Sequence, residues 1–398
     1  MAVPYYRPDL RAEEIEEVCE TLRSGWLTTG PRVARFEREF AAAVGAETAV
    51  ALNSATAAMH VATAALGLRR GDAVLVPTMT FAATAEVVLY AGATPILVDC
   101  DERTLGIDLD DARAKIERLR EGALLDLEPD TSVVGVMPVH VGGLMIDMTE
   151  LREFAAELDL WTIEDAAHAF PASYRDAKGW HTAGQNTASV SCFSFYANKT
   201  ITTGEGGMAV TSRRDLADRM RCLSLHGLSS DAWGRYRSGG SWDYRIVAAG
   251  FKYNLTDVAA AIGIHQLARA EEMREARREV ARRYDELLID LARTGQLELP
   301  SEPADRRHAW HLYQVRLAPD AAVDRDDVIR RLGAAEIGTS VHWRPLHLHP
   351  LYEEAGWTPD DCPVASEVWE RTLSLPIFPT MRDAEVREVA AALRAAIV

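Results

Sequence analysis

Three polar residues near the middle of the chain have the side chains that covalent chemistry on a bound ligand requires. Lys199 follows an apolar, strand-like run, and the neutral amine of a lysine forms Schiff bases with carbonyl groups. Asp165 closes the run LWTIED, and Ser194 lies near the end of SVSCFSF. Because burial lowers the pKa of an amine, we expect a partly neutral Lys199. The ordinary alternatives are a solvated surface lysine and an aspartate that caps a helix.

Three further features could surround a flat, phosphorylated ligand. The small residues NSAT at 53–56 open a helix, where free N–H groups and the helix dipole favour phosphate, although the same residues are also common helix caps. Phe81 could stack on a flat ring or belong to the core. His168, three residues after Asp165, could be a second ring contact or a core histidine.

Together these residues supply a phosphate-binding loop, a carboxylate and a lysine. A pyridoxal 5′-phosphate (PLP) site needs this inventory, because it requires a Schiff-base lysine and an acidic partner for the pyridine nitrogen. A dehydrogenase or a phosphotransferase would use the same side chains. The sequence contains neither GxGxxG nor GxxxxGK[ST], which weakens both of these rivals.

For these residues to meet, the elements that carry them must end at one edge of a sheet. The chain alternates strand-like runs with helical stretches over about residues 14–250, which predicts an α/β domain. The runs are apolar throughout, as in a parallel sheet covered on both faces, and such sheets bind ligands at the carboxyl ends of their strands. The predicted strands are 49–52, 73–77, 94–98, 133–139, 160–165 and 189–195, and the predicted helices are 55–66, 83–90 and 149–158.

The last third of the chain has a different pattern. Residues 256–293 are predicted to form one long charged helix or two in succession. A strand at 310–317, a helix at 324–334, a short strand near 339–342 and a final helix at 382–397 follow. We therefore predict a large domain at 1–255, and a connecting helix with a small C-terminal α/β domain at 256–398.

Composition limits the possible partners. The formal net charge is −17, from 60 acidic and 43 basic residues, which argues against nucleic acid because its phosphates would be repelled. The five cysteines are far apart in sequence and form no CxxC, so neither a disulfide framework nor a zinc site is expected. No apolar stretch is long enough to span a membrane, and the N-terminus lacks an apolar signal core. We expect a cytoplasmic protein with reduced thiols.

Seven motifs make the chain recognisable. They are NSATAAMH at 53–60, P-T-x-T-F at 77–81, EDAAHA at 164–169, SFYANKTITTGEGG at 194–207, HG at 226–227, GFKYNLTDVAAAIG at 250–263 and HAWHLY at 308–313. On these motifs the sequence resembles the DegT/DnrJ/StrS family of sugar aminotransferases. The likeness runs from SGWLTTGP at 24–31 to LPIFP at 375–379, and its most specific feature is the spacing of 34 residues between Asp165 and Lys199.

The resemblance implies a fold-type I PLP-dependent transferase of the aspartate-aminotransferase type, with a large mostly parallel-sheet domain and a smaller C-terminal α/β domain. In that family Lys199 would hold PLP and move the proton, and Asp165 would pair with the pyridine nitrogen. Some members carry histidine in place of the lysine and catalyse dehydration, so Lys199 favours transamination. The other cofactor contacts that the resemblance implies within one chain are Phe81 on the ring, Ala55, Thr56 and Ser194 on the phosphate, and His168 beside the cofactor. Asn254 would reach the phosphate of the neighbouring subunit, so the resemblance also implies a homodimer with shared active sites.

The resemblance also implies the substrates. Glutamate is the usual donor, and the motifs are most similar to the branch that aminates C4 of a nucleotide-linked 4-keto-6-deoxy sugar, with dTDP-4-keto-6-deoxyglucose as the first choice. A C3 aminotransferase, an enzyme for UDP- or GDP-linked sugars and a non-catalytic PLP-binding regulator are the alternatives. No metal is expected, because the histidines of HWRPLHLH at 342–349 match no zinc pattern. The expected sugar and nucleotide contacts are Trp26, Thr28, Thr29, His226, His342 and His347.

Overall fold

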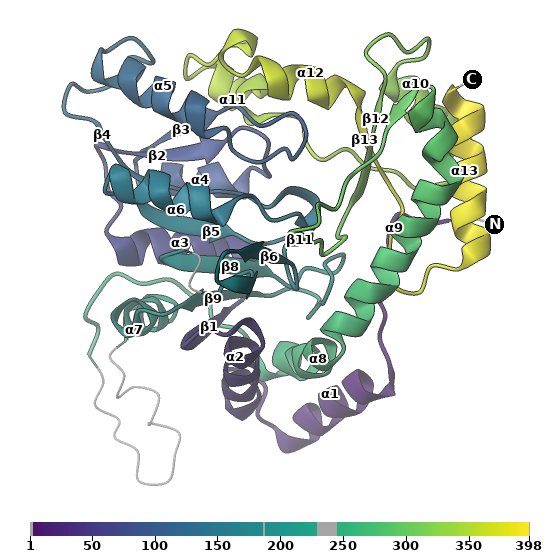
Figure 1. Cartoon of the computed structure of the whole chain (residues 1–398). Coiled ribbons are helices and arrows are strands. Elements are labelled where there is room, and N and C mark those ends of the chain that lie inside the picture. Colours follow the sequence, from purple (N-terminus) through teal and green to yellow (C-terminus); the bar gives the residue numbers. More distant parts are fainter. Residues whose placement is uncertain (1–2, 186–187, 229–244, 398) are drawn as a thin grey trace.

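A seven-stranded sheet forms the centre of the fold (Figure 1). The computed structural model describes residues 3–185, 188–228 and 245–397. The strand order is β1-β9-β8-β5-β4-β2-β3; β9 runs antiparallel to both of its neighbours, and the other pairs are parallel. The strands are β1 (Thr48–Leu52), β2 (Asp72–Pro77), β3 (Thr94–Val98), β4 (Ser132–Val136), β5 (Trp161–Asp165), β8 (Val190–Ser194) and β9 (Gly207–Thr211).

Helices cover this sheet because its strands are apolar on both faces. One of them, α3, is capped by the side chain of Ser54, which accepts a hydrogen bond from the N–H of Ala57 at 3.0 Å. The helix ends at Gly67, whose φ of +88° is a left-handed conformation that glycine adopts without strain. The helices of the large domain are α2 (Pro31–Val44), α3 (Ala55–Leu66), α4 (Ala83–Tyr90), α5 (Leu109–Arg120), α6 (Met148–Glu157) and α7 (Arg214–Leu223).

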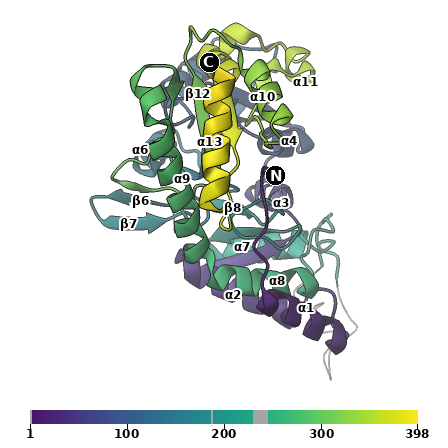
Figure 2. The same cartoon turned by 90° about the vertical axis from the view of Figure 1, so that its right-hand side faces the viewer.

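Two successive helices connect this part to a smaller domain. The first, α8 (Asp257–Ala268), packs on α2 and on α1 (Ala12–Ser24). The second, α9 (Ala270–Arg293), runs along the molecule to lie beside α13 (Asp383–Ile397) (Figures 1 and 2). None of the helices in the described ranges is both long and apolar enough to cross a membrane. The small domain contains the antiparallel sheet β10 (Leu297–Glu298), β12 (Tyr313–Leu317) and β13 (Thr372–Leu375), together with α10 (Arg325–Ala334).

The structure differs from the sequence prediction in three strands or groups of strands. The strand expected at 310–317 begins at Tyr313, because the chain turns before it with Trp310 at a φ of +52°. The strand expected near 339–342 is reduced to one bridge between Ser340 and Ser374. A further three-stranded sheet has no apolar run to mark it in the sequence, because its strands are short and polar: β6 (Ser173–Asp176), β7 (Gly179–Thr182) and β11 (Arg306–Arg307).

The segment 346–371 returns to the large domain. Leu346, Tyr352 and Trp357 belong to the same buried cluster as the strands of the large sheet, whereas Val3 joins the core of the small domain. The two cores therefore do not follow the order of the chain. The elements of the segment are η3 (Leu346–Leu348), α11 (Pro350–Glu353), η4 (Pro359–Asp361) and α12 (Pro363–Arg371).

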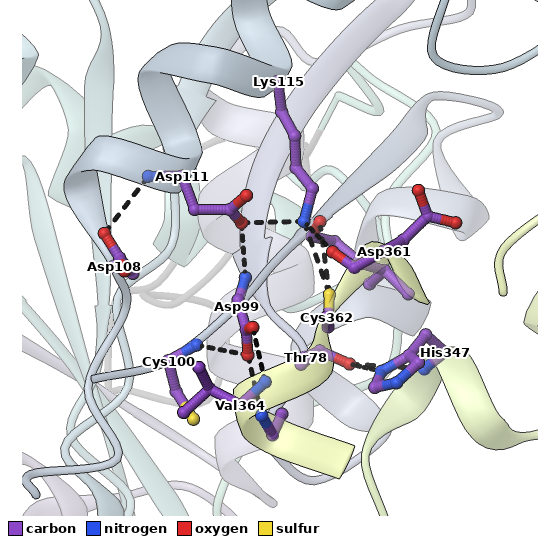
Figure 3. Close-up of polar contacts among 12 residues, drawn as sticks. Thr78, Asp99, Cys100, Asp108, Asp111, Lys115, His347, Asp361, Cys362 and Val364 are labelled. Atoms are coloured by element: carbon purple, nitrogen blue, oxygen red, sulfur yellow. Dashed lines mark hydrogen bonds and ion pairs between the residues drawn. The ribbon is translucent and has the colours of Figure 1, made fainter. Parts of the chain in front are cut away.

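A buried polar network fixes η4 and α12 to β3 and α5 (Figure 3). Asp99, directly after β3, accepts a hydrogen bond from the N–H of Val364 at 2.9 Å, in the first turn of α12. Lys115 of α5 is 1% exposed and donates to Asp111 Oδ2 at 2.7 Å and to the carbonyl of Asp361 at 2.8 Å. These contacts, called the Lys115 network below, hold the returning segment against the sheet.

Candidate active site

A cavity of about 380 Å³ opens at the carboxyl ends of the parallel strands. This size is in the range of small-molecule sites, and the carboxyl edge is where open α/β sheets bind ligands. Residues that follow β1 and β2, that end β5 and that follow β8 all reach it. Eight of the residues predicted from the sequence line the cavity: Ala55, Thr56, Phe81, Asp165, His168, Ser194, Lys199 and His342.

Lys199 lies in the loop after β8 and has the environment of a reactive amine. Protein atoms surround its side chain, and this desolvation lowers the pKa of Lys199 to about 8, although the charge of Asp165 acts in the opposite direction. Its Nζ is 3.4 Å from Nε2 of His311. With that pKa, roughly a tenth of the amine is neutral at pH 7, far more than for an exposed lysine. The pKa shift expected from the sequence is therefore present.

Asp165 is a buried carboxylate that the fold holds in one orientation. Its Oδ2 accepts a hydrogen bond from Thr84 Oγ1 at 2.7 Å, and its Oδ1 accepts one from the N–H of Ala167 at 3.1 Å. Burial raises the pKa of Asp165, and these two hydrogen bonds together with the charge of Lys199 oppose the rise. A carboxylate in this setting gains from a cationic partner such as a protonated ring nitrogen.

Three neutral imidazoles stand around the lysine. Burial lowers the pKa of His168 and of His311 well below the ordinary histidine value, and it lowers the pKa of His342 to about 4. The His168 ring stacks on Trp343, with centroids 5.0 Å apart, and lies 4.2 Å from the His311 ring. The buried Nδ1 atoms of His168 and His311 have no hydrogen-bond partner within the described ranges, so both remain able to donate or accept.

The phosphate-binding features predicted from the sequence lie together. In the first turn of α3, which contains Ala55 and Thr56, the backbone N–H groups have no carbonyl within the helix to which they can donate a hydrogen bond. Such free N–H groups bind anions. The start of β9 approaches this turn so closely that a Cβ at Gly207 would lie 2.3 Å from the backbone of Ser54. Ser194 Oγ accepts a hydrogen bond from the N–H of Tyr196 and faces the same cavity.

Phe81 completes a site that fits PLP. The residue is 61% exposed and lines the cavity, although a phenylalanine is normally buried. An aromatic face, a lysine, a buried carboxylate and a phosphate-binding turn are the groups that PLP requires. In the part of the chain that the structure describes, no cluster of three or more metal-binding side chains occurs, so nothing in the donor set points to a metal.

A second group of predicted residues lies outside the cavity of its own chain. Asn254 Nδ2 donates to Thr29 Oγ1 at 2.7 Å, and Thr29 Oγ1 donates to the carbonyl of Leu255. Trp26 Nε1 donates to the carbonyl of Thr29, and the carbonyl of Thr28 accepts from the backbone of Asp257. These contacts bring Trp26, Thr28, Thr29 and Asn254 into one cluster outside the cavity.

Two predicted substrate residues are placed elsewhere. His347 is fully buried, and one ring nitrogen contacts Thr78 Oγ1 at 2.7 Å (Figure 3). The other ring nitrogen contacts Ser366 Oγ at 2.8 Å. Because both nitrogens are engaged inside the protein, His347 is not a substrate contact; it ties the returning segment to the end of β2. His226 also does not line the cavity, and its backbone N–H donates to the carbonyl of Phe251.

Three residues of the site are not evident from the sequence. Thr84 orients Asp165 from the first turn of α4, and His311 and Trp343 lie beside Lys199 and His168. His311 falls in the motif HAWHLY, and Trp343 falls in HWRPLHLH, so both stretches are distinctive although neither motif assigns a role to these residues. Thr84 gives no signal, because a threonine in a helical run has no distinctive spacing.

Comparisons with known proteins agree with this geometry. A model of the DegT/DnrJ/EryC1/StrS aminotransferase family matches residues 8–394. The chain belongs to this family. The spore coat polysaccharide biosynthesis protein SpsC of Bacillus subtilis is 44% identical over 395 residues, which cover 98% of this chain and 96% of SpsC.

Solved structures described as sugar aminotransferases have the same architecture. The PLP form of Spr1654 from Streptococcus pneumoniae, described as a sugar aminotransferase, is 28% identical, with a TM-score of 0.86 over 100% of this chain and 98% of that one. The sugar aminotransferase CalS13 from Micromonospora echinospora is also 28% identical, with a TM-score of 0.83 over 99% of both chains. The shared architecture confirms the predicted fold class. The PLP form of a sugar aminotransferase with this architecture, together with the family match, confirms the predicted cofactor.

Proposed function

We propose that this aminotransferase moves an amino group from L-glutamate to C4 of a nucleotide-linked 4-keto-6-deoxy sugar, with dTDP-4-keto-6-deoxyglucose as the first candidate. The observation that carries the proposal is the meeting of Lys199, Asp165 and Phe81 in one cavity. PLP bound there supplies the electron sink that stabilises a carbanion during the exchange of nitrogen. A sugar substrate is supported by the relatives, because SpsC is named for polysaccharide biosynthesis and CalS13 is a sugar aminotransferase.

The side chains of this protein have distinct tasks in the proposal. Lys199 takes the proton from the α carbon of the donor and later delivers a proton to the sugar carbon, and a pKa of about 8 lets it do both near neutral pH. Asp165 keeps the ring nitrogen protonated, since a buried carboxylate favours a cation beside it. His168, His342 and Trp343 form a wall that excludes water from the reacting carbon.

The proposal includes a homodimer with shared active sites. The cluster of Trp26, Thr28, Thr29 and Asn254 lies outside the cavity of its own chain, where it would serve the phosphate and the nucleotide sugar of a second copy. Leu22 and Leu27 add exposed apolar surface beside the cluster, which a second copy would cover. The cytoplasmic location stays a prediction from the sequence.

The decisive experiment supplies the holoenzyme with L-glutamate and with dTDP-, UDP- and GDP-linked keto sugars, and then identifies the products by NMR. We expect 2-oxoglutarate together with a sugar that carries nitrogen at C4. Nitrogen at C3 would replace the proposal with the C3 alternative. Bound cofactor without any 2-oxoglutarate would indicate a non-catalytic regulator instead.

Replacement of Lys199 tests the central role directly. Lys199→Ala removes the group that transfers the proton, so turnover should fall by at least about 10²–10⁴-fold. Lys178→Ala is the control, because Lys178 is an exposed lysine outside the cavity. Turnover of Lys199→Ala at the rate of the control would refute the proposed mechanism.

A further inference from the structure

Within the described ranges, His311 is the residue that contacts the Lys199 amine by a hydrogen bond. Its Nε2 lies 3.4 Å from Nζ of Lys199, which is long but within reach of a hydrogen bond. Asp165 acts on the amine through its charge, and no hydrogen bond or ion pair joins it to Lys199 in the described part of the chain. His311 is 4% exposed, so the contact is shielded from bulk water. The orientation of the Lys199 amine therefore depends on this imidazole.

Backbone contacts with the large domain hold the segment that carries His311. The N–H of Ala309 donates to the carbonyl of Gly143 at 3.0 Å, and the N–H of Leu312 donates to the carbonyl of Gly142 at 3.1 Å. Both glycines belong to a turn after β4 and have positive φ angles of +68° for Gly142 and +102° for Gly143. A Cβ at Gly143 would lie 3.3 Å from the backbone nitrogen of His311, so glycine permits the close approach. The imidazole is thus fixed from both sides of its own position in the chain.

One ring nitrogen of His311 has no partner. Burial lowers the pKa of His311 well below the ordinary histidine value, so the ring is neutral and carries one proton. When Nε2 accepts a hydrogen bond from Lys199, this proton is on Nδ1. The buried Nδ1 has no hydrogen-bond partner within the described ranges, and an unpartnered buried donor lowers stability. Packing alone does not favour a histidine at this position, which calls for a role at the lysine.

We propose that His311 is a positioning residue whose Nε2 accepts one N–H of the Lys199 amine and so aims that amine at the reacting carbon, an inference that rests on the proposed aminotransferase function. A lysine amine has three rotatable donors on a flexible stem, and holding one of them restricts the direction of the rest. The proton that Lys199 takes from the donor carbon stays on Nζ until Nζ delivers it to the sugar carbon. His311 remains neutral in both transfers and gains no proton.

The alternative is that His311 only fills space between the two domains, and three variants separate the roles. His311→Gln keeps a side-chain acceptor, whereas His311→Leu keeps a similar volume and offers no acceptor. His347→Leu is the matched control, because His347 is also a buried histidine but lies outside the main cavity. Both of its ring nitrogens are bonded within the protein, so its loss should lower Tm and change the chemistry by less than about threefold.

The half-reaction of the holoenzyme with L-glutamate is followed by the absorbance of the cofactor. For His311→Leu we expect the rate constant at saturating glutamate to fall by about 10–100-fold, because a hydrogen bond to a group that becomes charged is lost. The slowed step should show a primary isotope effect with glutamate deuterated at the α carbon. His311→Gln should stay within about fivefold of the wild type, and Tm of His311→Leu should not fall, because an unpartnered buried donor is removed.

Three results would overturn the proposal. The first is a rate constant of His311→Leu that is unchanged, or that falls without an isotope effect. The second is a fall in Tm as large as that of His347→Leu, which would assign His311 a structural role. The third is a His311→Gln protein as slow as His311→Leu, because a side-chain acceptor would then not be what the amine needs.

A titration of the cofactor-free protein makes the test independent of turnover. An acceptor at Nε2 favours the ammonium form, so His311→Leu should lower the pKa of Lys199, which is about 8 in the wild type, and His311→Gln should restore it. Amine labelling as a function of pH measures this pKa. The other titratable groups around the pair stay the same in every variant: Asp165, His168, Arg277 and His342.

This titration also separates the inference from the proposed function. A wild type that transaminates nothing, but whose Lys199 pKa depends on His311, refutes the proposed function and keeps the contact between the two side chains. Identical pKa values of Lys199 in the wild type and in His311→Leu would overturn the role of His311, whatever the enzyme aminates.

Discussion

Replacing Lys115 with methionine tests how the returning segment 346–371 is held beside the active site (Figure 3). The Lys115 ammonium donates to Asp111 and to the carbonyl of Asp361, and it lies 5.6 Å from the centre of the Trp357 ring. Methionine keeps most of the apolar stem and removes the charge and all three hydrogen bonds that the ammonium donates, the third of which goes to Cys362 Sγ at 3.4 Å. The substitution therefore isolates the polar contribution of the Lys115 network from its packing.

The size of the effect follows from the burial of each partner. The two hydrogen bonds from the charged donor to oxygen acceptors contribute about 1.5–3 kcal/mol each, and the one to the Cys362 sulfur adds little because sulfur is a weak acceptor. Asp111 is 26% exposed, so its carboxylate can regain water in the variant. Removing the buried ammonium also removes the cost of its desolvation. We therefore expect the free energy of unfolding to fall by about 3 kcal/mol. An unfolding entropy of about 2.1 cal/mol/K per residue over 398 residues converts this loss to a fall in Tm of about 4 °C.

The assay is thermal unfolding of the holoenzyme by calorimetry, with Arg113→Met as the control. Arg113 is on the same helix α5, and its ion pair with Glu157 is solvent-exposed, with side chains 42% and 60% exposed. Such a pair contributes little, so the control should lie within about 1 °C of the wild type. A Lys115→Met protein that also unfolds within about 1 °C of the wild type would refute the reasoning, because the buried bonds would then add nothing net.

Three further predictions concern charge and titration. Asp165→Asn removes the charge that favours the ammonium of Lys199, so the pKa of Lys199 should fall below about 8. Amine labelling of the cofactor-free protein as a function of pH measures this pKa. A labelling profile identical to that of the wild type would contradict the prediction. Thr84→Val removes the 2.7 Å hydrogen bond that opposes the raised pKa of Asp165. We expect kcat to fall about tenfold with KM little changed. An unchanged kcat would count against a role of Thr84 in holding the Asp165 carboxylate. Burial lowers the folded-state pKa of three histidines below their unfolded value, so the unfolded state binds more protons in acid. Tm should therefore fall as the pH drops from about 6.5 to about 4. A constant Tm over this range would contradict the lowered pKa values of these histidines. The three histidines are His308, with a pKa of about 3, and His342 and His347, each with a pKa of about 4.

The sequence determined the sheet and the chemistry at its edge. A parallel strand buried on both faces must be apolar throughout, so runs such as AVLVP and LWTIED could be assigned to strands from their composition. A charged residue that closes such a run lies at the carboxyl end of a strand, so the sequence alone was enough to predict Asp165 at the edge of the sheet. The motifs around Lys199 then identified the family. Short polar strands such as β6 and β11 could not be predicted, because they have no apolar run to reveal them.

Only the tertiary structure decided which distant side chains surround Lys199 and how this environment shifts the pKa of its amine. His311 and Arg277 approach the lysine from the small domain and the connecting helix, and neither position is distinguishable by spacing from a surface residue. His347 belongs to the same histidine-rich run as His342, yet it is buried against Thr78 while His342 lines the cavity. The pKa of Lys199 depends on this packing, since desolvation comes from atoms contributed by segments far apart in the chain. The sequence thus determined which reactive group is present, and the packing of the two domains decided its reactivity and its neighbours.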